Sequence, residues 1–428
     1  MLSESELNIL SNGNGLCNTH VHLEDVQLAI EESFDTQSQL GPNAEFTVVG
    51  DGNGFLSRVI LVKPDWTSKN ETLPDKLILK IASCVHIKTI IQKLKMNNQG
   101  ALNPEKEKQL FEMFEVEAQQ LHNREVNMYK IFEKWNKNDT ILNSKVYFSK
   151  KFTPDNSLKG FIGMEYIENP VIRHMYVNCQ PHELHAVLKS IANLQASGFH
   201  LSDEDKESLE GYDATRMIKR MTEDGGLENI LRTAKKINAG VLDEKVERLV
   251  NHGLDLINLD IVADTNKFVG IEHPVLVHGD LWSANILWNE KNGEHVVKKV
   301  IDYQMIHFGN PAEDLIRLFL STLSGADCRN HHEKLLEVFY EYLFEATNGD
   351  QMPYSLEQLK ESYRLHFVPA GLKMLPMYGP IAQMKLSMGN EEDIEMYRQI
   401  LTEKTEHLLD DMDKFYSYTQ KFMENFQK

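Results

Sequence analysis

The chain has 428 residues, of which 41% are hydrophobic and 25% are charged, and its formal net charge is −19 at pH 7. This length exceeds what one hydrophobic core usually supports, so we expect two domains or lobes. The acidic balance argues against sequence-independent binding to nucleic acid or to an anionic membrane, because both require basic patches. It still allows a nucleotide ligand, which a few local donors and a metal ion can hold.

The four cysteines lie far apart and form no Cys-x-x-Cys pair, which favours a reduced, cytoplasmic chain. The N-terminal segment lacks the basic and then apolar profile of a signal peptide, and no apolar run is long enough to cross a bilayer. We therefore expect a cytoplasmic protein with no membrane span and no nucleic-acid partner.

Residues 1–40 are expected to form a polar, loose arm followed by a short amphipathic helix, because Leu23, Val26, Ile30 and Phe34 recur at helical spacing. The patterns that follow predict a β-rich lobe over residues 41–166. A polar segment rich in Lys and Asn, 83–107, is expected to be an insertion in this lobe. The predicted strands of this lobe are 45–49, 55–64, 76–82, 145–152 and 160–167, and its predicted helix is 109–135.

The glycines Gly50, Gly52 and Gly54 lie between the first two predicted strands. By themselves they fit a tight hairpin turn equally well. A dinucleotide-binding fold needs a helix after such a loop, whereas here another strand follows, as in the flap that covers the phosphates in kinases. The chain has no Gly-x-x-x-x-Gly-Lys-Ser/Thr motif, which excludes a P-loop.

Lys80 lies in the third predicted strand and shares a face with Ile78 and Ala82. A lysine among apolar neighbours could reach phosphate oxygens, and the alternative is an edge-strand lysine whose amine lies in water. Glu125 is the acidic member of an apolar stripe on the 109–135 helix. It could point inward and pair with Lys80, or it could be a solvated glutamate at the border of the stripe.

Glu165, Tyr166 and Ile167 end the fifth predicted strand shortly before Pro170, which disfavours helix at the residue before it. We expect the hinge between the lobes here, with the backbone groups of these three residues facing an adenine. The alternative is an ordinary strand end.

Residues 167–428 are mostly helical in pattern and are interrupted by a predicted catalytic loop at 275–314. An apolar run leads into His278-Gly279-Asp280, and Asn285 follows with four residues between. A second β-rich run leads to Asp302. Phosphoryl transfer needs such parts: an Asp to orient and deprotonate a hydroxyl, and an Asn and a second Asp to hold Mg²⁺.

The stretch from His278 to Trp288, together with His-Asn-Arg-Glu at 122–125, resembles the aminoglycoside-phosphotransferase and choline-kinase-like superfamily. Within it the stretch is most similar to the ecdysteroid-kinase-like branch and its nematode CHK-kinase-like group. The resemblance covers roughly Phe46 to Met377. It implies an α+β, bilobal, protein-kinase-like fold with an N-terminal antiparallel β lobe and a larger, mainly helical C-terminal lobe.

The resemblance also implies a role for each matching residue. Asp280 would be the catalytic base, and Asn285 and Asp302 would ligate Mg²⁺. Lys80, positioned by Glu125, would hold the α- and β-phosphates of ATP. His278 would support the loop structurally, and Gly50, Gly52 and Gly54 would cover the triphosphate. Asp314 would brace the loop, and the alternative for its carboxylate is capping of a helix N-terminus.

Two departures from protein kinases favour a small acceptor. Gly279 stands where protein kinases carry Arg, and Tyr303-Gln304 rather than Phe-Gly follows Asp302. The segment from Asp302 to Asp314 is too short for a long activation segment. We therefore expect a Mg-ATP-dependent kinase that phosphorylates an alcohol hydroxyl, such as that of a sterol or a xenobiotic.

Two alternatives stay open at this point. The first is a catalytically silent nucleotide-binding or regulatory protein, although the complete residue set counts against it. The second is a metal-dependent hydrolase, for which the ligand spacing of His-Glu-x-x-His is missing. Its candidate ligands are in His20-Val21-His22, His182-Glu183-Leu184-His185 and His331-His332-Glu333.

Overall fold

A computed structural model describes residues 8–50, 56–85, 104–137, 140–349, 351–381 and 391–426. The chain divides into two compact units. The N-terminal unit comprises residues 1–138 and 143–169, and the C-terminal unit comprises residues 139–142 and 170–428.

A five-stranded sheet in the order β1-β2-β3-β5-β4 is the centre of the N-terminal unit, and all of its pairings are antiparallel. The five strands predicted from the sequence are all present. The central strand is β3, so Lys80 does not lie on a sheet edge, and the edge-strand alternative for it is wrong. The strands are β1 (Glu45–Val48), β2 (Ser57–Lys63), β3 (Leu77–Ala82), β4 (Val146–Lys150) and β5 (Phe161–Glu165).

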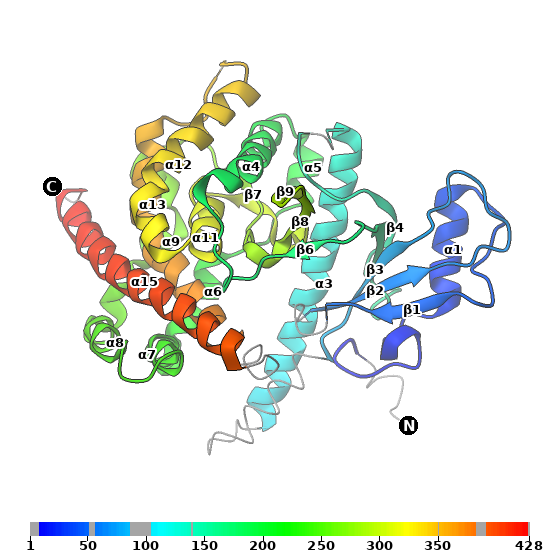
Figure 1. Cartoon of the computed structure of the whole chain (residues 1–428), viewed down its shortest axis with the longest axis horizontal. Coiled ribbons are helices and arrows are strands. Elements are labelled where there is room, and N and C mark those ends of the chain that lie inside the picture. Colours follow the sequence, from blue (N-terminus) through cyan, green and yellow to red (C-terminus); the bar gives the residue numbers. More distant parts are fainter. Residues whose placement is uncertain are drawn as a thin grey trace. The chain divides into compact units, whose positions relative to one another are not determined.

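One helix packs on each face of this sheet, because successive side chains of a strand point to opposite faces. The helix α1 (Leu23–Phe34) packs on the face that carries Leu77, Leu79 and Ile81 (Figure 1). Ala82 belongs to the other face and packs with Ala118 of α3 (Pro104–Trp135). The face that carries Lys80 is therefore the face that α3 covers.

Two boundaries differ from the sequence-based expectation. Residues 8–20 are not a loose arm, because Ile9 and Leu10 are buried and the Ile9 carbonyl accepts a hydrogen bond from the Cys84 amide at 2.8 Å. The helix α3 begins at Pro104, so residues 104–107 form its first turn rather than part of an insertion. A proline and acidic residues suit the first turn of a helix. Residues 86–103 of the predicted insertion lie outside the described residues.

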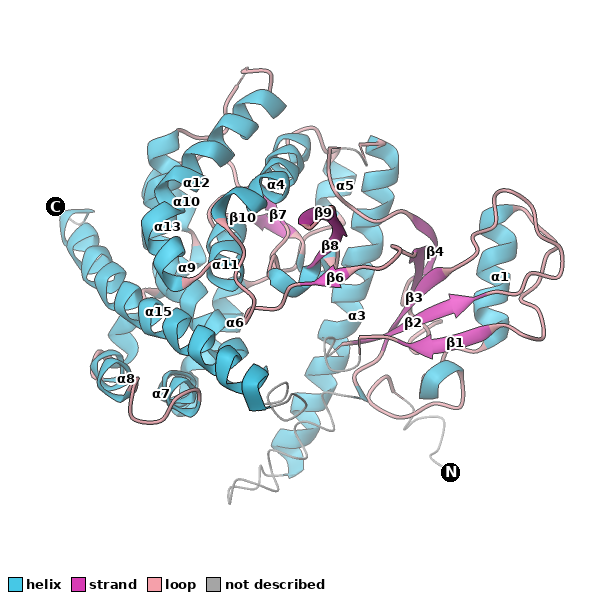
Figure 2. Cartoon of the chain, viewed as in Figure 1, coloured by secondary structure: helices cyan, strands magenta, loops and turns pink. Residues whose placement is uncertain are grey.

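Helices make up most of the C-terminal unit (Figure 2). Its short strands form an antiparallel β6-β8-β9 sheet and an antiparallel β10-β7 pair. These strands are β6 (Val171–Ile172), β7 (Val275–Val277), β8 (Ile286–Lys291), β9 (Glu294–Val300) and β10 (His307–Gly309). The helices are α4 (His185–Gly198), α5 (Asp203–Glu207), α6 (Ala214–Thr222), α7 (Gly226–Thr233), α8 (Asp243–Val250), α9 (Leu259–Ala263), α10 (Thr265–Val269), α11 (Glu313–Thr322), α12 (Gly325–Ala346), α13 (Leu356–Pro376) and α15 (Glu391–Phe426).

The helix α11 is buried along most of its length and is held at its C-terminal end by three other segments. A helix leaves its last carbonyls without partners inside the helix. Here the Tyr378 hydroxyl donates to the Leu320 carbonyl at 2.6 Å, Lys404 Nζ to the Ser321 carbonyl at 3.1 Å, and the Cys179 amide to the Thr322 carbonyl at 2.7 Å. These contacts hold α11 in place, so the residues in its N-terminal half have fixed positions.

Across the described ranges, no helix is both long enough and apolar enough to cross a membrane. The predicted fold class is confirmed: an N-terminal antiparallel β unit and a larger, mainly helical C-terminal unit.

Candidate active site

The strand β7 leads into His278, whose side chain is completely buried and hydrogen-bonded at both ring nitrogens. Its Nε2 lies 3.0 Å from the Ile301 carbonyl, which can only accept, so Nε2 carries the hydrogen. Its Nδ1 then accepts from the Asp280 amide at 3.2 Å. The ring therefore ties the start of the loop to the residue before Asp302, and His278 supports the loop structurally.

Gly279 occupies a position that only glycine fits. Its φ is +80°, and a Cβ there would lie 2.2 Å from the Met305 carbonyl oxygen. A side chain would therefore meet both backbone strain and a backbone clash. This close approach packs the catalytic loop against the segment that follows Asp302.

Asp280 is largely buried and has a partner on each carboxylate oxygen. Arg317 Nη2 donates to Oδ1, and Asn285 Nδ2 donates to Oδ2 at 3.2 Å. Burial raises the pKa of the Asp280 carboxyl above its ordinary value, Arg317 counteracts the rise, and the negative charge of Asp302 adds to it. Asp302 is attached to the same loop, because the carbonyl of Ile301 just before it accepts from His278 Nε2.

Asn285 lies in the short turn Ser283–Asn285, and its Nδ2 also donates to the Asp280 carbonyl at 2.9 Å. Both contacts use the nitrogen of the amide, so its Oδ1 is the atom suited to a metal ligand. The Asn285 carbonyl accepts from the Ile301 amide at 2.9 Å, which joins it to the chain just before Asp302. An amide oxygen and a carboxylate are hard oxygen donors of the kind that Mg²⁺ prefers, alongside substrate phosphates.

Asp314 braces the loop rather than capping its own helix. Its carboxylate accepts from the backbone amides of His278 and Gly279 at 2.7 and 2.9 Å, although it stands in the first turn of α11. Burial raises the pKa of Asp314 to about 6, against the opposing effect of these two hydrogen bonds. The geometry agrees with the brace implied by the resemblance.

Arg317 is the site residue that the sequence reasoning missed. It follows Asp314 by three positions on α11, so the two side chains lie on the same side of the helix. A count along the helix from Asp314 would have pointed to it, but the loop motif itself contains no signal for an arginine.

In the N-terminal unit, Lys80 and Glu125 form a buried ion pair. Lys80 Nζ lies 2.9 and 2.7 Å from the two oxygens of Glu125, whose side chain is only 1% exposed. This pairing agrees with the inward orientation predicted from the apolar stripe, and the solvated alternative for Glu125 is wrong. The role of Lys80 toward phosphates stays a prediction.

The residues just before Glu125 fix its helix against the end of β4. His122 Nε2 donates to the Lys150 carbonyl at 2.8 Å, and Asn123 exchanges two hydrogen bonds with the backbone of Phe152 at 2.8 and 2.9 Å. Burial lowers the pKa of His122 to about 4, so the ring is neutral near pH 7. These contacts set the rotation of α3 that brings Glu125 to Lys80.

The structure gives less information on the other residues predicted to contact a nucleotide, which are the three glycines and residues 165–167. Gly50 has a φ of +69°, which favours glycine, whereas Gly52 and Gly54 lie outside the described residues. The Glu165 amide already donates to the Lys145 carbonyl at 2.9 Å, so it is not a donor for adenine. The expected adenine contacts of Tyr166 and Ile167 stay predictions.

In each of the three histidine groups considered for a hydrolase, a ring nitrogen lies within hydrogen-bond distance of a backbone carbonyl or a hydroxyl. His20 Nε2 lies 2.9 Å from the Asn8 carbonyl, His185 Nδ1 lies 3.2 Å from the Tyr342 hydroxyl, and His332 Nδ1 lies 3.1 Å from the Cys328 carbonyl. Within the part of the chain that the structure describes, no three His, Cys, Asp or Glu side chains are placed to hold a metal ion. The observed contacts therefore give no support to the hydrolase alternative.

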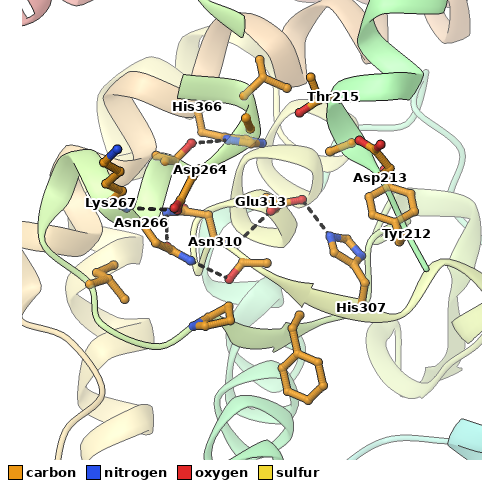
Figure 3. A pocket seen from close by; sticks show the side chains of 18 of the residues that line it. Tyr212, Asp213, Thr215, Asp264, Asn266, Lys267, His307, Asn310, Glu313 and His366 are labelled. Atoms are coloured by element: carbon orange, nitrogen blue, oxygen red, sulfur yellow. Dashed lines mark hydrogen bonds and ion pairs between the residues drawn. The ribbon is translucent and has the colours of Figure 1, made fainter. Parts of the chain in front are cut away.

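A separate cavity of about 600 Å³ is lined by residues from α6, α9, α10, β10, α11 and α13 (Figure 3). In its wall His307 Nε2 lies 3.3 Å from Glu313 Oε2, and Glu313 Oε1 accepts from the Asn310 amide at 2.8 Å. Burial opposes ionisation of Glu313, but His307 beside it holds the pKa of that carboxyl below its ordinary value. None of the site residues predicted from the sequence lines this cavity.

Comparison with known proteins gives one family and two curated relatives. The model of the family DUF1679, described as "Uncharacterized oxidoreductase dhs-27", matches residues 9–420. The Caenorhabditis elegans protein of that description is 24% identical over 336 residues, 75% of this chain and 38% of that protein. The "Uncharacterized kinase-like protein D1044.1" of C. elegans is 28% identical over 184 residues, 42% of this chain and 46% of that protein. The chain thus spans less than half the length of each relative.

Solved structures with a similar fold include two kinases. Choline kinase from Cryptosporidium parvum Iowa II has a TM-score of 0.44 at 11% identity, with 94% of this chain and 97% of that chain covered. The microcompartment-associated aminopropanol kinase has a TM-score of 0.43 at 12% identity, with 92% and 98% covered.

Proposed function

The chain belongs to the DUF1679 family, and we propose that it is a Mg-ATP-dependent small-molecule kinase that transfers the γ-phosphoryl group to an alcohol hydroxyl. The observation that carries this proposal is the catalytic loop, in which the Asn285 amide donates to the Asp280 carboxylate, the amide of Ile301 just before Asp302 donates to the Asn285 carbonyl, and Asp314 braces the backbone.

In the proposed reaction Asp280 accepts the proton of the acceptor hydroxyl, whose oxygen forms a bond to the γ-phosphorus. The bond from that phosphorus to its β–γ bridging oxygen breaks, and ADP leaves. Asn285 Oδ1 and Asp302 would hold Mg²⁺, which when bound neutralises charge on the phosphate oxygens. Lys80, held by Glu125, would hold phosphate oxygens of ATP. Positioning and charge neutralisation then supply most of the rate enhancement.

The acceptor class rests on the resemblance of the stretch from His278 to Trp288 to ecdysteroid-kinase-like proteins. We propose a neutral, lipophilic alcohol, such as a sterol or a hydroxylated xenobiotic. The spacing of the cysteines supports action in the cytoplasm.

The name of one relative contains the word oxidoreductase, which suggests hydride transfer as a second candidate activity. That name describes a protein of which the match covers only 38%. A dinucleotide-binding fold needs a parallel sheet with a helix after the glycine loop. The sheet of the N-terminal unit is antiparallel throughout, and the strand β2 follows β1 in the chain. These features favour phosphoryl transfer over hydride transfer for this chain.

A catalytically silent nucleotide-binding protein is the remaining alternative. The experiment that separates it from a kinase is a screen of sterols and other hydroxylated compounds with Mg²⁺ and ATP, read out by mass spectrometry as addition of one phosphoryl group. A product that requires both the protein and ATP supports the kinase. Nucleotide binding without any product across the screen contradicts the transfer reaction and favours the silent alternative.

A further inference from the structure

Three polar side chains on one face of α11 contact the catalytic loop. Asp314, Arg317 and Ser321 are spaced by three and four positions, which places them on a common helix face. Asp314 accepts from the amides of His278 and Gly279, as described above, and Ser321 Oγ accepts from the Ser283 amide at 3.0 Å. The two outer residues of the face therefore hold the loop backbone on either side of Asp280.

Arg317, the middle residue, contacts the side chain of Asp280 rather than the backbone. Its Nη2 donates to Oδ1, while Asn285 Nδ2 donates to Oδ2 at 3.2 Å. The side chains of Arg317 and Asp280 are 16% and 14% exposed. The pair is therefore largely shielded from water, and its attraction is stronger than that of an ion pair on the surface.

Two donors from different elements fix the carboxylate in two ways. Arg317 comes from the buried helix α11, and Asn285 comes from the turn that follows the loop. With one oxygen tied to each donor, rotation of the carboxylate about its last bond would break both contacts. Each oxygen keeps a further lone pair, because a carboxylate can accept about four hydrogen bonds. Asp280 can thus be held in place and still accept a proton.

We propose that Arg317 is a positioning residue that orients the Asp280 carboxylate toward the acceptor hydroxyl. The proposal rests on the proposed kinase function. A base works only within hydrogen-bond reach of the proton that it takes, and a misplacement of 1 Å can cost about 10²-fold in rate. Arginine suits this role because its planar guanidinium holds a carboxylate in a defined geometry, whereas lysine acts as a point charge.

The surroundings of the guanidinium support a fixed position. Arg317 Nη1 lies 3.8 Å from the buried Met374 Sδ of α13, which packs against it. Its buried Nε has no hydrogen-bond partner among the described residues. The contact with Asp280 is therefore the strongest polar interaction that the structure gives Arg317.

The test compares Arg317→Met, Arg317→Lys and Ser321→Ala in the full chain. Ser321→Ala is the matched control, because it removes a loop contact from the same helix face without touching Asp280. ADP release from Mg-ATP is measured with the best alcohol of the screen, or with water as acceptor where no alcohol reacts. We expect Arg317→Met to lower kcat by about 10- to 100-fold while KM for ATP stays within about twofold. Arg317→Lys should recover part of the loss, and Ser321→Ala should retain most of kcat.

Equal losses in Arg317→Met and Ser321→Ala would overturn the proposal, because they would indicate only general support of the loop. An unchanged kcat in Arg317→Met would overturn it as well. A double-mutant cycle of Arg317→Met with Asp280→Asn on the melting temperature tests the contact without activity, and additive shifts would show that the pair does not form. Failure of the proposed function looks different: the unsubstituted protein would release no ADP, and a role in orienting a base would then fall with it.

Discussion

Each unit contains one buried ion pair at its candidate site, and the two pairs are held in different ways. Lys80 and Glu125 stand on a central strand and on a long helix, and the ammonium lies within 2.9 Å of both carboxylate oxygens. Asp280 stands on a loop and divides its two oxygens between Arg317 and Asn285. A strand ladder fixes the backbone of Lys80, whereas the backbone of Asp280 needs the brace from Asp314. Asp280 thus depends on side-chain partners for its orientation, whereas Lys80 and Glu125 are oriented by the strand and the helix on which they stand.

The largest effect is expected from Asp280→Asn. Removal of a positioned general base should lower turnover by about 10²- to 10⁴-fold while nucleotide binding stays close to normal. The measurement is ADP release, with nucleotide affinity measured separately. Asp411→Asn is a matched control, because Asp411 also pairs with an arginine, Arg329, in the same unit. Turnover that persists in Asp280→Asn and equals that of the control would contradict the role of Asp280 as the base.

The pair in the N-terminal unit should respond mainly in stability. Lys80→Met leaves the Glu125 carboxylate buried without its cation, and breaking a buried pair in this way costs about 3–5 kcal/mol. Replacing both partners, as in Lys80→Met with Glu125→Leu, should restore most of the free energy of unfolding, measured in urea. Lys76→Met is the control, because its pair with Glu168 is exposed and should contribute little to stability. A single variant as stable as the double variant would contradict this account.

The brace should appear as a dependence of stability on pH. The pKa of Asp314 is raised to about 6 in the folded state from an ordinary value of 3.8. The folded state therefore binds this proton more tightly, so the associated stability is complete below about pH 4 and is lost as the pH rises through 6. The loss amounts to about 3 kcal/mol at most.

Asp314→Asn removes the titrating group, so the difference in free energy of unfolding between this variant and the unsubstituted protein should change between pH 4 and 6 and stay level above 7. Measurement of urea unfolding across this range checks the prediction. A difference that is constant from pH 4 to 7 would show that the carboxyl of Asp314 has an ordinary pKa.

The same comparison explains what the sequence could predict. The pairing of Lys80 with Glu125 follows from strand alternation and from an apolar helix stripe, which are local patterns. The catalytic loop residues follow from a motif with fixed spacing. The five strands and the division into a β-rich and a helical part also have local signals in the hydrophobic pattern.

Arg317 and the packing of residues 8–20 lacked such signals. The partner of Arg317 is 37 positions away, and the rotation of α11 that brings them together is set by packing around the helix. Ile9 and Leu10 are two apolar residues in a polar segment, and their burial depends on the surface that Ala82 and Cys84 offer. Both features are products of tertiary contacts, which single-segment patterns do not contain.

The most direct test of the central claim is a calorimetric titration of ATP into the purified protein, with and without Mg²⁺. The account predicts binding that strengthens with Mg²⁺ and loses this dependence in Asp302→Ala, because Asp302 and Asn285 would hold the ion. Absence of ATP binding under both conditions would contradict the account, since the catalytic loop would then be present without its nucleotide.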